Sequence, residues 1–105
     1  MVLTLRRAGS TLVIAAEGRL GAATAPTLAE TLAAAIADGD RRILLDLKGL
    51  DYISSAGILA LQAVAARLRT DGGTLIVCRP TPPVRLALEL AGCPPDIDVA
   101  DELIA

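Results

Sequence analysis

The sequence has no histidine, no tryptophan and no phenylalanine among its 105 residues. Without histidine, the chain lacks the usual general base of a hydrolase and the commonest protein ligand of zinc. The single lysine, Lys48, does not follow a serine at Ser-x-x-Lys spacing, and neither a Gly-x-Ser-x-Gly motif nor a Gly-x-x-x-x-Gly-Lys phosphate loop is present. We therefore predict a protein that is not an enzyme and that has no catalytic residues, no metal site and no cofactor.

Clusters of basic residues and aromatic side chains are also scarce. The formal net charge is -2, the nine arginines are scattered along the chain, and Tyr52 is the only aromatic residue. Binding to nucleic acid without sequence preference requires a concentrated basic surface, and base stacking requires several aromatic rings. Nucleic acid is therefore excluded as an expected partner.

Long hydrophobic runs are missing as well. The longest ones, Leu12–Ala16 and Ile43–Leu45, are far shorter than the roughly 20 residues of a membrane-spanning helix. The charged pair Arg6-Arg7 follows the first apolar residues, which is the reverse of the order in a signal peptide. We expect a cytoplasmic protein without direct membrane insertion, in which Cys78 and Cys93 are reduced, buried small side chains.

The residues that are abundant predict one folded domain. Hydrophobic residues make up 53% of the chain, and a chain of this length is typical of one domain with one core. The alternation of side chains predicts a hairpin, and the longer apolar patterns predict alternating helices and strands. We expect a single α/β domain with a mixed sheet of about five strands and four helices. The expected strands are Val2–Arg7, Thr11–Glu17, Ile43–Leu47, Thr74–Cys78 and Ile97–Val99.

Local signals place the four helices between these strands. Thr24 and Thr81 are expected N-caps, each followed by proline in the first turn, and a third helix is expected to begin at Ser55. Glycines and aspartates end these helices, and a helical tail is expected from Asp101. The strand Ile43–Leu47 is apolar on both faces, which predicts a central strand covered on both sides, followed by a loop at residues 48–51.

The segment that connects this central strand to the next helix carries a family resemblance. It reads Asp46-Leu47 at the strand end and then Tyr52-Ile53-Ser54-Ser55-Ala56-Gly57-Ile58. Further matches are Gly72-Gly73 before a strand ending in Cys78, and the segment Val84–Gly92. With these features, residues 1–105 resemble a single STAS domain of the bacterial anti-sigma factor antagonist type. The chain departs from the pattern at Gly21, where many members carry aspartate, and at Ser54, where aspartate is commoner.

The resemblance implies a protein-binding module that is switched by phosphorylation. Ser55 stands at the phosphoacceptor position, the implied partner is an anti-sigma factor serine kinase, and a metal-dependent phosphatase of the PP2C type resets the switch. A phosphate at the start of a helix suits the local structure, whereas its charge disfavours docking of a protein on a nearby apolar strip. The residues expected in the switch loop and the partner-binding strip are Ile53, Ser54, Ala56, Gly57, Leu59, Ala60 and Ala63.

Other interpretations of the same residues remain open. Taken alone, Ser55 is more typical of a helix N-cap than of a phosphorylation site. STAS domains also resemble subunits of lipid-transport ATP-binding-cassette complexes and the tails of anion transporters, although Ser-Ser-Ala-Gly in place of Thr-Gly-Gly argues against the lipid-transport subunit. A nucleotide sensor is a further alternative that no residue of the sequence requires. Asp46 is expected to form a loop hydrogen bond at its strand end, and Gly57 to allow close approach of the backbone.

Overall fold

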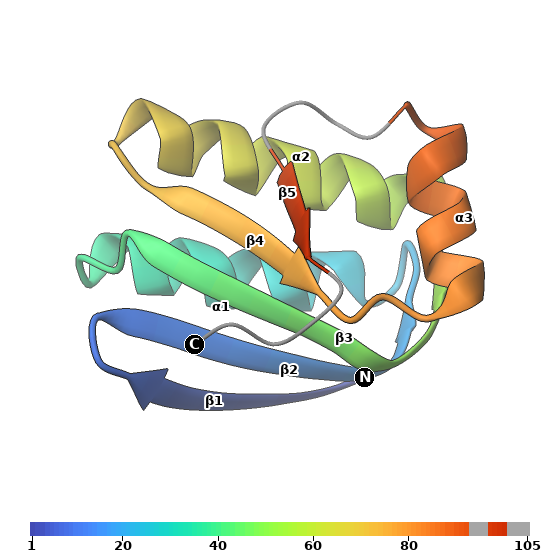
Figure 1. The fold of residues 1–105 in the computed structure, drawn as a ribbon, viewed down its shortest axis with the longest axis horizontal. Coiled ribbons are helices and arrows are strands. Elements are labelled where there is room, and N and C mark those ends of the chain that lie inside the picture. The colour runs from blue at the N-terminus through green and yellow to red at the C-terminus, as the bar shows by residue number, and fades with distance from the viewer. Residues whose placement is uncertain (93–96, 101–105) are drawn as a thin grey trace.

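The computed structural model describes residues 1–92 and 97–100. Strands and helices follow one another in the predicted order over these residues (Figure 1). The expected helical tail from Asp101 and the side chain of Cys93 lie outside the described residues. The elements are β1 (Val2–Ala8), β2 (Thr11–Leu20), α1 (Ala25–Ala37), β3 (Arg42–Ile53), α2 (Ser55–Thr70), β4 (Thr74–Cys78), α3 (Pro82–Leu90) and β5 (Ile97–Ala100).

The strands form one mixed sheet in the order β1-β2-β3-β4-β5. β1 pairs with β2 in an antiparallel hairpin, whereas β2, β3, β4 and β5 run parallel to one another. The predicted fold class and the five strands are therefore confirmed. The described part of the chain contains three helices. The fourth predicted helix is the tail from Asp101, which lies outside the described residues.

The helices cover one face of the sheet and build the main core against it. Alternate side chains of β2, β3 and β4 pack there against the apolar sides of α1, α2 and α3, as the period of two in a strand requires. On the other face Val13, Leu44, Ile76 and Cys78 form a smaller buried cluster. Since Leu44 and Leu45 are both fully buried on opposite faces, the prediction of a central strand covered on both sides is confirmed. Cys78 is a buried free thiol, as expected.

The loop expected at residues 48–51 is not a loop, and that prediction was wrong. β3 continues through these residues to Ile53, and β2 continues to Leu20 beside it. Two register shifts between β2 and β3 allow the pairing to continue past Gly18 and Gly49. The apolar side chains of Leu50 and Ile53 are buried by this extension, which outweighs the turn preference of the glycine and the charged residues around it.

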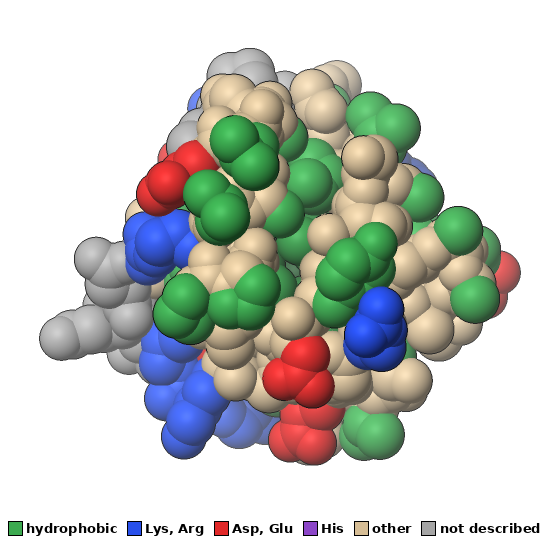
Figure 2. All heavy atoms as spheres, turned by 90° about the vertical axis from the view of Figure 1, so that its right-hand side faces the viewer, with side chains coloured by type: hydrophobic (Ala, Val, Ile, Leu, Met, Phe, Trp, Pro, Cys, Tyr) green, Lys and Arg blue, Asp and Glu red, His purple; other side chains and the backbone are tan. Residues whose placement is uncertain are grey.

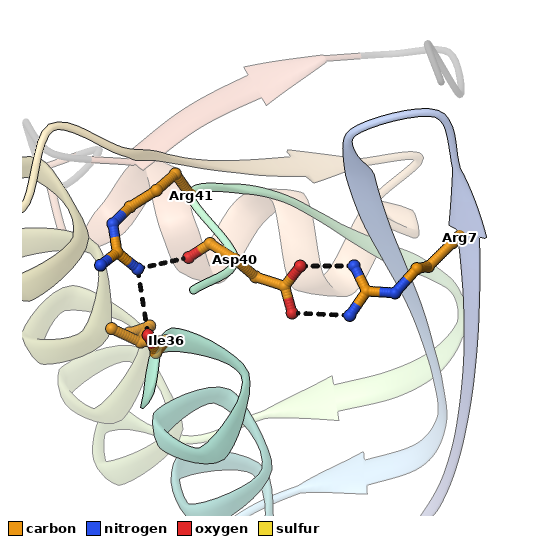
Figure 3. A network of polar contacts seen from close by, with 4 residues as sticks. All are labelled: Arg7, Ile36, Asp40 and Arg41. Carbon is orange, nitrogen blue, oxygen red and sulfur yellow. Dashed lines mark hydrogen bonds and ion pairs between the residues drawn. The ribbon is translucent and has the colours of Figure 1, made fainter. Parts of the chain in front are cut away.

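An ion pair connects the β1–β2 hairpin to the turn before β3 (Figure 3). The Asp40 carboxylate accepts hydrogen bonds from Nη1 and Nη2 of Arg7 at 2.5 and 3.0 Å. Arg41 donates to the carbonyl oxygens of Ile36 and Asp40 at 3.0 and 2.9 Å. The hydrogen bonds from Arg7 hold the pKa of Asp40 below its usual value.

A second ion pair connects Asp46 of β3 to Arg79, the residue that follows β4. Asp46 accepts hydrogen bonds from the backbone N–H of Lys48 at 3.1 Å and from Nε of Arg79 at 3.2 Å. Burial alone would raise the pKa of Asp46, but the hydrogen bonds from Arg79 and Lys48 outweigh it, so the pKa is lowered. Asp46 forms hydrogen bonds as predicted, but it lies inside β3 and not in a loop at the end of the strand, because β3 continues to Ile53. Arg79 is the partner that the sequence did not indicate.

Candidate functional site

The junction between β3 and α2 is fixed by Ser54 and not by Ser55. Ser54 has extended backbone angles, its Oγ accepts a hydrogen bond from the backbone N–H of Gly57 at 3.2 Å, and its own N–H donates to the Leu20 carbonyl at 2.9 Å. Ser54 is therefore the N-cap of α2. The interpretation of Ser55 as the cap is wrong, because the first hydroxyl of the serine pair already occupies that position.

Ser55 is the first residue of α2, and its side chain is exposed. Within residues 1–92 and 97–100, no group forms a hydrogen bond with the Ser55 hydroxyl. Ala56 beside it is exposed as well. The hydroxyl is thus available to another protein and has no structural hydrogen bond to lose.

Gly57 allows α2 to begin against the end of β2. A Cβ atom at this position would lie 2.8 Å from Cγ of Leu20 and 2.9 Å from the Leu20 carbonyl oxygen. These distances are too short for any side chain, so the predicted close approach of the backbone at Gly57 is confirmed. The same packing keeps the start of α2 beside the β2–α1 loop.

The apolar strip predicted after Ser55 is present only in part. Leu59 is 64% exposed and Ala63 is exposed, whereas Ala60 is half-buried against the core. Ile53 is only 5% exposed, so its assignment to an exposed strip was wrong. Its side chain is the last apolar group of β3 and packs in the main core.

Two exposed leucines of α3 extend the apolar surface and were missed in the sequence. Leu90 is 80% exposed and Leu86 is 55% exposed. A shallow depression of about 280 Å³ separates α3 from the start of α2. Figure 2, which faces α3 and the start of α2, shows apolar side chains gathered on this side of the molecule. The sequence signal for this surface was the spacing of Leu86 and Leu90, which are four residues apart and do not belong to the buried stripe of Val84 and Leu88. The depression is lined by Ile53, Ser55, Ile58, Ala87, Leu90 and Ala91.

A larger open depression of about 660 Å³ lies on the other side of Ser55. The β2–α1 loop forms one wall, and the end of β3 with the start of α2 forms the other. Arg19 lies over the ring of Tyr52, with its Cζ 4.4 Å from the ring centre. Sequence reasoning did not associate these two residues with Ser55, because they are brought together only by the late pairing of β2 with β3. The lining residues are Arg19, Gly21, Ala22, Ala23, Thr24, Tyr52, Ser54, Ser55 and Ala56.

The site offers no arrangement for metal chemistry in the part of the chain that the structure describes. No group of three or more histidine, cysteine, aspartate or glutamate residues is close enough there to hold a metal ion. Among the described helices, none combines the length and the apolar character needed to cross a membrane. The geometry of the site is that of an exposed hydroxyl between two depressions, next to an apolar surface.

Comparison with known proteins agrees with this architecture. The sequence profile of the STAS domain family matches residues 3–103. The chain belongs to the STAS domain family. This STAS domain is 40% identical over 92 residues to BtrV of Bordetella bronchiseptica, which is named as a candidate anti-sigma factor antagonist; the match covers 88% of this chain and 79% of BtrV.

Two solved structures share the fold of this STAS domain at lower sequence identity. The anti-sigma factor antagonist SpoIIAA in its unphosphorylated form has a TM-score of 0.80 and 23% identity, covering 96% of this chain and 90% of that one. The Bacillus cell fate determinant SpoIIAA in its phosphorylated form has a TM-score of 0.73 and 22% identity, covering 96% and 93%. At this identity the likeness shows the fold alone.

Proposed function

We propose that this STAS domain is an anti-sigma factor antagonist. It binds an anti-sigma factor serine kinase while Ser55 is unphosphorylated and releases the kinase once Ser55 carries a phosphate. The 40% identity to BtrV supports the type of function. The position of Ser55 supports the switch, because it is an exposed hydroxyl beside an apolar surface.

The observation that carries the proposal is the division of roles between the two serines. Ser54 supplies the hydrogen bond that caps α2, and the Ser55 hydroxyl has no partner among the described residues. A phosphate on Ser55 therefore breaks no hydrogen bond among the described residues. Its charge also lies at the positive end of the α2 dipole, where an anion is tolerated. Phosphorylation should thus leave the fold intact.

The surface around Ser55 explains why binding should be lost. Leu59 and Leu90 present exposed apolar side chains on α2 and α3. The smaller depression lies between α3 and Ser55. A partner that covers this surface must remove water from it. A phosphate adds a charge of about -1.5 to -2 at neutral pH, and burying that charge without a partner is costly.

The covalent steps require a kinase and a phosphatase, and this chain supplies only the acceptor. The γ-phosphorus of ATP forms a bond with Oγ of Ser55, its bond to the β-phosphate oxygen breaks, ADP leaves, and the hydroxyl proton passes to a base of the kinase. A PP2C-type phosphatase reverses the change: water attacks the phosphorus, the bond to Oγ breaks, and inorganic phosphate leaves. No catalytic step is assigned to this protein.

Incubation with the anti-sigma factor kinase and ATP, followed by fragment mass spectrometry, tests the proposal. The chain contains three serines, and we expect one phosphate on Ser55. Ser55→Ala should abolish the modification, whereas Ser10→Ala, in the exposed β1–β2 turn, serves as the matched control and should not change it. A phosphate on Ser54, or none at all, would refute the switch assignment.

A further inference from the structure

Among the residues that the structure describes, Arg19 is the only charged one that lines the larger depression beside Ser55. It lies near the end of β2, next to the β2–α1 loop. Thr24 stabilises this wall, because its hydroxyl donates to the Arg19 carbonyl at 2.7 Å and accepts from the Gly21 N–H at 3.0 Å. The backbone that carries Arg19 is therefore held in place across the depression from α2.

The guanidinium of Arg19 is positioned by stacking and not by an ion pair. Its Cζ lies over the Tyr52 ring, 4.4 Å from the centre. Over the described ranges, no carboxylate forms an ion pair with Arg19. Stacking uses the flat face of a guanidinium and leaves the N–H groups at its edge available to an oxyanion. Arg19 is thus a pre-positioned cation with unused donors on the wall that faces Ser55.

We propose that Arg19 receives the phosphate of phosphorylated Ser55, so that the guanidinium and the phosphate form an ion pair across the larger depression. This inference rests on the proposed phosphorylation of Ser55. A phosphate offers several oxygens to the planar fork of an arginine, which binds such groups through two parallel hydrogen bonds. The ion pair would hold the phosphate on the side of the β2–α1 loop and would fix the phosphorylated state in one conformation.

A substitution at Gly21, in the same depression, would weaken the proposed ion pair without removing Arg19. Gly21 has no side chain, and a Cβ atom there would make an ordinary contact of 3.9 Å with the Tyr52 ring. Gly21→Asp would therefore place a second anion near Arg19 without a clash, in competition with the phosphate. Gly21→Asn has the same shape without the charge and is the matched control.

The test is a ³¹P NMR titration of protein in which phosphoserine is incorporated at position 55 during translation, so that no kinase is needed. Free phosphoserine has its second pKa at about 6. A neighbouring guanidinium should lower this pKa, by about half a unit for a pair that is open to solvent. Arg19→Gln should raise the phosphate pKa by about that half unit, while any lowering by the start of α2 remains. Arg6→Gln, at an exposed arginine of β1, should leave the pKa of the parent unchanged. Gly21→Asp should raise the pKa, and Gly21→Asn should not.

A second readout identifies the donor directly. The Nε–H resonance of Arg19 should move downfield with the same midpoint as the phosphorus signal, and circular dichroism should show that every variant is folded. The inference is overturned if the phosphate pKa is the same in the parent and in Arg19→Gln, or if Arg6→Gln changes it equally. The proposed function fails separately, if phosphoserine at position 55 leaves the affinity for the kinase unchanged.

Discussion

The two adjacent serines at the start of α2 should respond to mutation in opposite ways. Ser54 accepts the capping hydrogen bond from Gly57, whereas the Ser55 hydroxyl is exposed and has no partner among the described residues. Loss of a serine cap costs about 1 kcal/mol, within a range of roughly 0.5 to 2 kcal/mol. For a domain of this size, that corresponds to a decrease in melting temperature of about 4 to 8 °C. We expect this decrease in Ser54→Ala.

Ser55 variants should keep their stability and change their affinity instead. Ser55→Ala removes an exposed hydroxyl, so its free energy of unfolding should stay within about 0.5 kcal/mol of the parent. Ser55→Asp places a carboxylate at the positive end of α2, so it should be at least as stable as the parent. In a complex, however, the same carboxylate would be desolvated, at a cost of about 1 to 3 kcal/mol. The kinase should therefore bind Ser55→Asp about fivefold to 150-fold more weakly.

Thermal unfolding followed by circular dichroism, together with calorimetric titration of the kinase, measures both properties on the same samples. Ser54→Ala should be less stable, and Ser55→Asp should be stable but weak in binding. The reasoning is refuted if affinity follows stability across the variants, or if Ser55→Ala is destabilised as much as Ser54→Ala. Either result would mean that Ser55 is a structural residue.

Three further predictions concern packing, charge and the apolar surface. Gly57→Ala should lower the free energy of unfolding by about 1 to 3 kcal/mol in urea denaturation, because the added Cβ atom overlaps the end of β2; an unchanged value would mean that the contact relaxes. The pKa values of Asp40 and Asp46 lie below their usual 3.8 in the folded state, so the ionised carboxylates should stabilise the fold fully above about pH 5. This contribution to the free energy of unfolding should be lost as the pH falls through the folded pKa values, which urea denaturation between about pH 2 and 7 measures. Asp46→Asn should reduce the pH dependence of the free energy of unfolding, and an unchanged pH dependence would contradict the assignment. Leu90→Ser should weaken kinase binding about tenfold or more without loss of stability, whereas Val2→Ser, at an exposed apolar residue of β1, should bind like the parent; equal binding by Leu90→Ser would remove α3 from the interface.

The sequence predicted the architecture well because its strongest signals are long and periodic. The alternation of β1, the continuous apolar run at the start of β3 and the helical spacing of Leu61, Ala65 and Leu68 each lead to one element type. The end of β3 was predicted incorrectly. Lys48-Gly49 has the composition of a turn, and only the pairing with the end of β2 makes it a strand.

The candidate site was predicted in outline and not in detail, for physical reasons. Two serines in succession give the same local signal, and only the geometry shows that Ser54 forms the capping bond. Burial of Ile53 is decided by the core and not by its neighbours in sequence. Arg19 lies more than thirty residues before Ser55, so their common depression depends on tertiary structure alone. Such long-range proximities are invisible in one sequence.

The most direct test of the switch is the affinity of the anti-sigma factor kinase for the unphosphorylated protein and for the protein with phosphoserine at position 55. The two titrations should be made by calorimetry under the same conditions, after circular dichroism has shown that both forms are folded. The switch predicts firm binding of the unphosphorylated form and binding at least about tenfold weaker after phosphorylation. Equal affinity of the two folded forms would contradict the central claim that a phosphate on Ser55 controls the docking surface.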